Sequence, residues 1–238
     1  MFPVTVTATR SISLMYNLVR GLIDWNKLDE ILDGLYVSML PVKHSPIGSV
    51  LSHTHLDIIE RIKQQNPKRP LGLVVSVVEK DELHGEGFLG FATVLPEDWE
   101  RAGVEHRLLE MRDFQAEVDT HQAIETVFYM KKVYDQGKSV VVHCKAGRAR
   151  SAMLCLLFMA LFSVDSETGQ LYSLDNALKL LQNKRKQVHV GNDKVQTAHN
   201  LLFIATTVWD AVGYKLPLSM MSIVFGYLAP SDVDSQIL

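Results

Sequence analysis

Hydrophobic residues in this chain occur either in short, nearly continuous runs or at every third or fourth position. Nearly continuous apolar runs of strand length occupy residues 71–78 and 139–142, and such runs are typical of strands buried in a parallel sheet. Shorter apolar segments predict further strands at residues 35–37 and 104–109. Strands that alternate with helical patterns indicate an α/β fold, in which helices flank a central and mostly parallel sheet.

Helices are predicted where apolar residues recur every three or four positions behind a capping residue. The predicted helices are residues 53–66, 119–136, 152–162, 173–186 and 193–210. In the first of them, Leu56, Ile59 and Ile62 are expected on the inner face. The third is apolar throughout, so it is expected to be buried on all sides.

The stretch with the clearest chemistry lies between the strand that ends at residue 143 and the helix that starts at residue 152. We call residues 143–151, with the sequence HCKAGRARS, the phosphate loop. A strand, a tight loop and a helix N-terminus bring backbone N–H groups together on an anion. Gly147 lets the loop turn, and Arg150 can fork onto two phosphate oxygens. The predicted phosphate-binding residues are Lys145, Ala146, Gly147, Arg148, Ala149 and Arg150.

Cys144 lies at the centre of this loop. A helix N-terminus and nearby cations can lower a cysteine pKa from ~8.5 to roughly 3.5–7.5, and the resulting thiolate can attack phosphorus. Ser151 can hydrogen-bond the sulfur and help it leave, and His143 is expected to orient the loop. The alternative is a buried structural cysteine in a glycine turn. It is disfavoured because cysteine, glycine, arginine and serine all stand in register between strand and helix.

The phosphate loop resembles the His-Cys-x5-Arg-Ser/Thr signature of the cysteine-dependent protein tyrosine phosphatase superfamily. Its sequence is most similar to the mitochondrial-type dual-specificity phosphatases that dephosphorylate phosphatidylglycerophosphate. Further similarity covers residues 32–37, 77–82, Trp99 and 103–105. The resemblance implies a dual-specificity-phosphatase fold and hydrolysis of a phosphomonoester through a phosphocysteine, without cofactor or metal. A catalytically silent phosphate-binding module is the competing class, and the intact Cys144, Arg150 and Ser151 argue against it.

The leaving alkoxide of such a reaction needs a proton from a carboxylic acid on a neighbouring loop. Asp113 is the expected acid, because it follows the strand at 104–109 and its distance from Cys144 in the sequence resembles the family's arrangement. Residues 114–117 depart from the family pattern, so other carboxylates stay open. These candidates are Glu110, Glu117 and Asp119. The loop after residues 71–78 is expected at the same edge of the sheet; it carries Glu79, Asp81, Glu82 and His84.

Composition limits the partners of this chain. Its 238 residues suffice for one substantial core. A formal net charge of −3 gives no global field that would attract nucleic acid, so any attraction for phosphate must be local. If Cys144 is a nucleophile, only one other cysteine remains, no structural disulfide is available, and a reducing compartment fits. That second cysteine, Cys155, is expected to be a small buried hydrophobe.

The two ends of the chain differ from its middle. We predict a targeting or membrane-associating segment at 1–23, a catalytic domain at 24–210 and an apolar extension at 211–238. Residues 1–23 contain two arginines and no acid, which is typical of a transit peptide. An interfacial membrane anchor and a helix packed on the domain are the alternatives. No run of 18 apolar residues occurs, so no ordinary transmembrane helix is expected.

The substrate is predicted from charges in the loop. Lys145 and Arg148 add two positive charges, and the resemblance to lipid-directed phosphatases with basic loops implies a multiply charged phospholipid headgroup. Two solvated surface charges are the alternative. Peripheral membrane contact is expected. The expected location is the mitochondrial inner membrane in a eukaryote, and otherwise the cytoplasm or the periphery of the membrane. There are two alternative functions. One is a dual-specificity protein tyrosine/serine/threonine phosphatase, whose substrate is a phosphoprotein, and the other is a phosphoinositide phosphatase.

A second basic cluster, residues 184–186, ends the helix predicted at 173–186. Cations in the last turn of a helix interact favourably with its dipole, and this is the expected role of the cluster. An anionic-lipid patch is the alternative.

Overall fold

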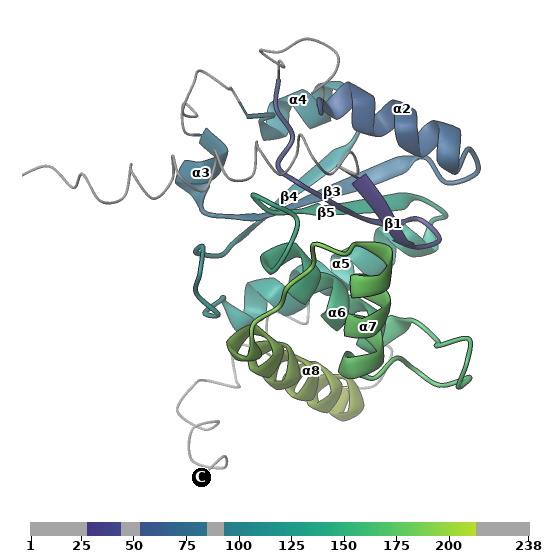
Figure 1. Cartoon of the computed structure of the whole chain (residues 1–238), viewed down its shortest axis with the longest axis vertical. Coiled ribbons are helices and arrows are strands. Elements are labelled where there is room, and N and C mark those ends of the chain that lie inside the picture. Colours follow the sequence, from purple (N-terminus) through teal and green to yellow (C-terminus); the bar gives the residue numbers. More distant parts are fainter. Residues whose placement is uncertain (1–27, 44–52, 85–92, 213–238) are drawn as a thin grey trace, which may run out of the picture.

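The structure of the protein is a computed structural model that describes residues 28–43, 53–84 and 93–212, with side chains described up to residue 207. In this part of the chain five strands form one sheet, in the order β1-β2-β5-β3-β4 (Figure 1). The strands are β1 (Leu28–Leu32), β2 (Leu35–Ser38), β3 (Leu71–Val78), β4 (Glu105–Glu110) and β5 (Ser139–His143). Among these five described strands, only β1 and β2 pair in antiparallel fashion. The predicted α/β fold with a mostly parallel sheet is confirmed.

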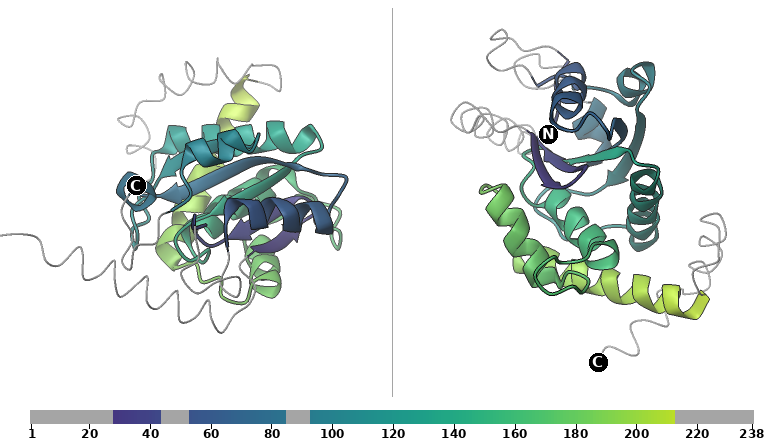
Figure 2. Two further views of the ribbon diagram at one scale, coloured as in Figure 1. Left: turned by 90° about the horizontal axis from the view of Figure 1, so that it is seen from above. Right: turned by 90° about the vertical axis from the view of Figure 1, so that its right-hand side faces the viewer.

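Helices cover both faces of this sheet. They are α2 (His55–Gln65), α3 (Lys80–His84), α4 (Pro96–Arg101), α5 (Thr120–Asp135), α6 (Arg150–Phe162), α7 (Leu174–Lys184) and α8 (Asn192–Val212). Helices α2 and α4 lie on one face, and α5, α6, α7 and α8 lie on the other (Figures 1 and 2). The fold therefore has three layers, with the central strands buried on both sides.

The alternation of side chains along each strand creates two separate cores. Val75 and Val142 contribute to the larger core, which the sheet forms with α5, α6, α7 and α8. Val74 and Val141, one position earlier, contribute to the smaller core with α2 and α4. The nearly continuous apolar runs of β3 and β5 are explained by this two-sided burial.

Helix α6 is the centre of the larger core. Every residue from 150 to 160 is buried, and the helix packs against α5, α7, α8 and the sheet. Fully burying one large apolar side chain stabilises a fold by about 1.5–3 kcal/mol, so this helix holds its N-terminus firmly in place. Cys155 lies within it, fully buried, and burial raises the pKa of its thiol. Cys155 is thus the buried hydrophobe that the sequence predicted.

The sequence pattern missed one strand and placed one residue on the wrong face of a helix. Strand β1 was not predicted, because its mixed pattern of apolar and charged residues gives it no apolar run. In α2, which Thr54 caps, Ile58 and Ile62 are buried, and Ile59 packs partly buried against the smaller core, as predicted for Ile59 and Ile62. Leu56 is 61% exposed, because the helix turns the face that carries positions 58 and 62 toward the sheet.

Several predictions concern residues outside those that the structure describes. They include the segment at 1–23, the apolar extension from residue 213 onward, and the loop at 85–92. Their assignment stays a prediction. Among the described helices, none combines the length and apolar character that a bilayer crossing requires.

Candidate active site

The phosphate loop connects the central strand β5 to the N-terminus of α6. It therefore lies at the carboxyl end of β5, between the ends of β2 and β3, where ligands of open α/β sheets bind. Gly147 adopts a φ of +63° in this loop. A Cβ atom there would lie 2.5 Å from the Ser38 carbonyl oxygen. Both the backbone conformation and the close approach require glycine at this position.

The carbonyl groups of residues 145–148 all accept hydrogen bonds from groups outside the loop. The Lys145 carbonyl accepts a hydrogen bond from the Leu40 N–H, and the Arg148 carbonyl accepts one from the His189 N–H. Between these two, the Ala146 and Gly147 carbonyls accept hydrogen bonds from the Arg185 guanidinium. The C=O and N–H of a trans peptide unit point in opposite directions. The N–H groups of residues 146–149 therefore face the inside of the loop.

Cys144 lies beneath these N–H groups and is 3% exposed. Burial acts to raise the pKa of its thiol, but the charge of Arg150 and hydrogen bonds from Ser151 and from the Arg148 backbone outweigh burial and hold the pKa below its ordinary value. The Ser151 hydroxyl donates to the sulfur over 3.3 Å. The geometry supplies the low-pKa thiolate that nucleophilic attack on phosphorus requires.

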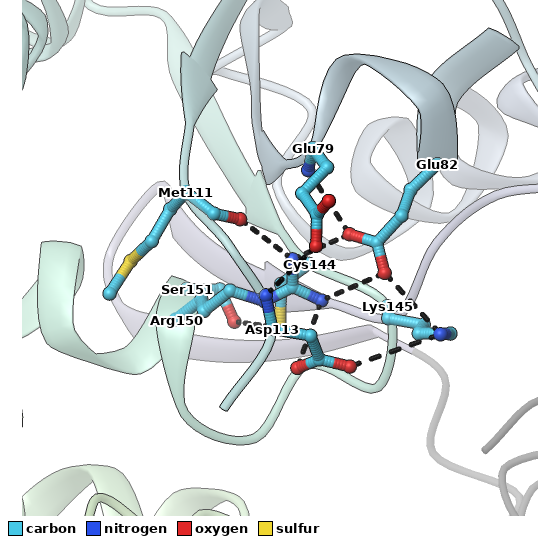
Figure 3. A network of polar contacts seen from close by, with 8 residues as sticks. All are labelled: Glu79, Glu82, Met111, Asp113, Cys144, Lys145, Arg150 and Ser151. Atoms are coloured by element: carbon cyan, nitrogen blue, oxygen red, sulfur yellow. Dashed lines mark hydrogen bonds and ion pairs between the residues drawn. The ribbon is translucent and has the colours of Figure 1, made fainter. Parts of the chain in front are cut away.

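Arg150 extends across the mouth of the loop into a group of carboxylates (Figure 3). Its Nη1 donates to Glu82 over 2.6 Å and to the Met111 carbonyl over 3.0 Å. Its Nη2 lies 3.3 Å from Asp113. Burial acts to raise the pKa of Glu82, but Arg150, the Glu79 backbone N–H and Lys145 together lower it. Glu82 is therefore ionised and fixes the plane of the guanidinium.

Lys145 lies on the same side of the site. Its side chain is buried, and its Nζ is 3.3 Å from Glu82 and 3.8 Å from Asp113. Arg148 takes a different direction: its Nε donates to the Gln187 carbonyl over 3.0 Å. The two additional cations of the loop thus occupy different parts of the site, and only Lys145 is next to the expected acid.

His143 is hydrogen-bonded to Ser76 on the neighbouring strand β3. Its Nε2 lies 2.7 Å from the Ser76 hydroxyl, which is also 2.7 Å from Nε2 of His106. Burial, together with the neighbouring His106, lowers the pKa of His143 to about 3, so the ring is neutral. The hydroxyl has a single proton, so one of the two histidines must donate to it from Nε2. These contacts fix the orientation of the His143 ring. The expected role of His143 in orienting the loop stays a prediction.

Among the four candidate acids, the structure places Asp113 against Arg150. The chain turns sharply after it, because Phe114 has a φ of +60°. The Phe114 side chain is 77% exposed. The other three line an open groove of about 470 Å³ that is rich in carboxylates. This groove is formed by Glu79, Asp81, Glu110, Arg112, Gln115, Glu117, Val118 and Asp119. Asp119 is also committed to capping α5.

Sequence reasoning missed two functional residues of the site. In the sequence, Glu82 is one of several acids in a loop near the expected ligand edge, whereas in the structure it is the main partner of Arg150. Arg185 does lie at the C-terminus of α7, as the predicted dipole role requires, but the lipid-patch alternative is wrong for this residue, because its side chain is buried behind the phosphate loop. Because Arg185 stands between Lys184 and Lys186 in the sequence, the local pattern does not indicate that its side chain is buried. The described residues contain no cluster of three or more His, Cys, Asp or Glu side chains suited to a metal.

Comparison with known proteins identifies the class of this site. The family model for the protein-tyrosine phosphatase domain matches residues 90–210, about half of the chain. The chain belongs to the protein-tyrosine phosphatase family, and it is a phosphatase of the cysteine-dependent type. No curated protein sequence matches it significantly.

Several solved structures are similar to this chain over nearly their own whole length. PTPMT1 in complex with PI(5)P has a TM-score of 0.58 at 17% identity, covering 76% of this chain and 98% of that one. Tk-PTP in its active form has a TM-score of 0.53 at 20% identity, covering 76% and 99%. Human DUSP28 has a TM-score of 0.50 at 15% identity, covering 76% and 95%. At these identities the likeness establishes the fold, which is that of the dual-specificity phosphatases.

The position of Asp113 predicts a selective effect of Asp113→Asn. Hydrolysis of alkyl phosphates should slow by about 10²–10⁴, because their leaving alkoxide needs a proton. Aryl phosphates with acidic leaving groups should slow only weakly, and the basic limb of the pH–rate profile should flatten. Steady-state rates on both substrate types test this, with Glu117→Gln as the control. Equal losses on both types would assign Asp113 a structural role.

The close approach at Gly147 predicts a loss of activity in Gly147→Ala. Its Cβ would displace the Ser38 carbonyl and the Arg185 guanidinium, so kcat should fall by about 10²–10³, as when an oxyanion donor is lost. Gly137→Ala is the matched control, because Gly137 also has a positive φ but no atom within 4 Å of the added carbon. That variant should lose stability yet keep its kcat. A similar kcat in both variants would contradict the packing argument.

Proposed function

We propose that this protein hydrolyses the phosphomonoester of a phospholipid headgroup, such as phosphatidylglycerophosphate. In the first step the Cys144 sulfur bonds to phosphorus while the P–O bond to the headgroup breaks. Asp113 gives its proton to the departing oxygen. In the second step a water oxygen attacks phosphorus and passes a proton to Asp113, and the P–S bond breaks. Ser151 stabilises the returning thiolate by donating to its sulfur.

The loop supplies the charge stabilisation that both steps need. Negative charge is spread over the three outer oxygens of the phosphoryl group during transfer, and fixed donors stabilise it there. The inward N–H groups of residues 146–149 and the fork of Arg150 are such donors. Because the surrounding structure already holds them, little reorganisation is needed during the reaction.

The observation that favours a lipid headgroup is the position of Lys145. The Lys145 ammonium lies 3.3 Å from Glu82 and 3.8 Å from Asp113, while the Glu79 carboxylate accepts from the Asp113 N–H. Lys145 thus places a buried positive charge beside Asp113, where the leaving group departs. This charge suits an alcohol that itself carries an anion, as the phosphodiester of phosphatidylglycerophosphate does. The structural likeness to PTPMT1 with PI(5)P also supports a lipid phosphate.

Membrane association belongs to the same proposal. An enzyme that acts on a lipid headgroup works at a bilayer surface. A membrane anchor raises the local concentration of substrate there without adding contacts in the active site. We assign this role to residues 1–23, and we expect peripheral contact at the mitochondrial inner membrane in a eukaryote. The second candidate function is that of a dual-specificity protein phosphatase, which the family and the likeness to human DUSP28 favour.

A substrate panel tests the proposal. Wild-type protein should prefer phosphatidylglycerophosphate, in vesicles and as a soluble short-chain analogue, over phosphotyrosine and phosphothreonine peptides. Lys145→Ala combined with Arg148→Ala should lower kcat/KM on both lipid forms at least tenfold, equivalent to about 1.4 kcal/mol, while a small aryl phosphate is largely spared. Removing residues 1–23 should slow hydrolysis in vesicles only.

The control for this charge effect is Lys184→Ala combined with Lys186→Ala. It removes two exposed positive charges from the end of α7 without touching the loop, so it should retain the wild-type preference. A wild-type protein that prefers phosphotyrosine peptides over every phospholipid would overturn the lipid assignment.

A further inference from the structure

Arg185 is the C-cap residue of α7, 38 positions after Gly147, and it is only 2% exposed. Its three guanidinium nitrogens have separate partners. Nε donates to the Gly147 carbonyl over 2.7 Å, and Nη2 donates to the Ala146 carbonyl over 3.3 Å. Nη1 donates to the Asp29 carboxylate on β1 over 2.5 Å. The side chain thus links the back of the phosphate loop to the edge of the sheet.

A buried arginine is a costly way to satisfy two carbonyl groups. Removing an ion from water costs several kcal/mol even after the protein relaxes, and a pairing carboxylate offsets this only in good geometry. A solvent-facing position would avoid the cost, as it does for the neighbouring Lys184 and Lys186. The contacts of Arg185 therefore point to a requirement of the loop itself.

One peptide unit shows what that requirement is. The Gly147 carbonyl accepts from Arg185, and the Arg148 N–H at the other end of the same unit donates to the Cys144 sulfur. A charged donor on the carbonyl fixes the plane of this unit and polarises it, which strengthens the bond that its N–H makes. The neighbouring unit, with the Ala146 carbonyl, is held in the same way. Arg185 therefore acts on the thiolate through the backbone.

We propose that Arg185 is a positioning residue, which aims the Gly147 and Arg148 N–H groups at the thiolate and at the bound phosphate, with Asp29 holding its guanidinium. The proposal rests on the cysteine chemistry described above, but on no particular substrate. It is tested with iodoacetamide and tungstate, neither of which requires turnover, so a failure of the lipid assignment would leave the result intact.

The test compares Arg185→Met with Lys184→Met, which removes an exposed charge one residue away. The pH dependence of Cys144 alkylation by iodoacetamide, followed by mass spectrometry of the Cys144 peptide, reports the pKa of the thiol. In Arg185→Met this pKa should rise by about one unit, as expected when a charged group loses hydrogen bonding worth roughly 1.4 kcal/mol. Tungstate affinity, measured by calorimetry, should fall about tenfold. Lys184→Met should match the wild type in both.

A folded Arg185→Met protein with the thiol pKa and tungstate affinity of Lys184→Met would overturn the proposal. If Arg185→Met does not fold, the same two measurements are made on Arg185→Lys, whose ammonium cannot reproduce the fork of a guanidinium. A smaller rise of the thiol pKa and a weaker tungstate affinity would support the proposal. Wild-type values in Arg185→Lys would overturn it.

Discussion

The direction of four peptide units determines what this protein can do. The carbonyl groups of residues 145–148 all bond outward, to β2-flanking backbone, to Arg185 and to the chain after α7. Their partner N–H groups consequently face inward, where an anion can accept from all of them. The strand before this loop is buried on both faces and the helix after it is buried from residue 150 to residue 160, so both ends of the loop are fixed. The site is therefore in place before a substrate arrives.

The second constraint is the balance of charge around Arg150. A buried guanidinium without partners would be strongly destabilising, and Glu82 and Asp113 provide them. The two carboxylates differ in what they can do. Glu82 is deeply buried and bonded to both Arg150 and Lys145, whereas Asp113 is partly exposed on a loop that turns sharply at Phe114. This difference lets one carboxylate hold the guanidinium while the other exchanges protons with the substrate and with water.

The sequence predicted those parts of the site that are contiguous in the chain. Strand, loop and helix follow one another directly at residues 139–162, so the roles of Cys144 and Arg150 could be assigned from local pattern alone. Glu82 and Arg185 could not be assigned in this way. They reach the loop from 68 and 38 positions away, and nothing in a single sequence distinguishes a buried arginine from the exposed lysines beside it. Strand β1 was missed for a related reason, because it is held by pairing with β2 rather than by an apolar run.

The central claim is that Cys144 becomes phosphorylated during turnover. The direct measurement is a rapid acid quench of the enzyme with a phosphate-labelled aryl substrate, followed by digestion and mass spectrometry of the labelled peptide. The account predicts a phosphoryl group on Cys144 in the wild type and in Cys155→Ser, and none in Cys144→Ser. Turnover without any labelled Cys144, or a phosphoryl group on another residue of the wild type, would contradict it.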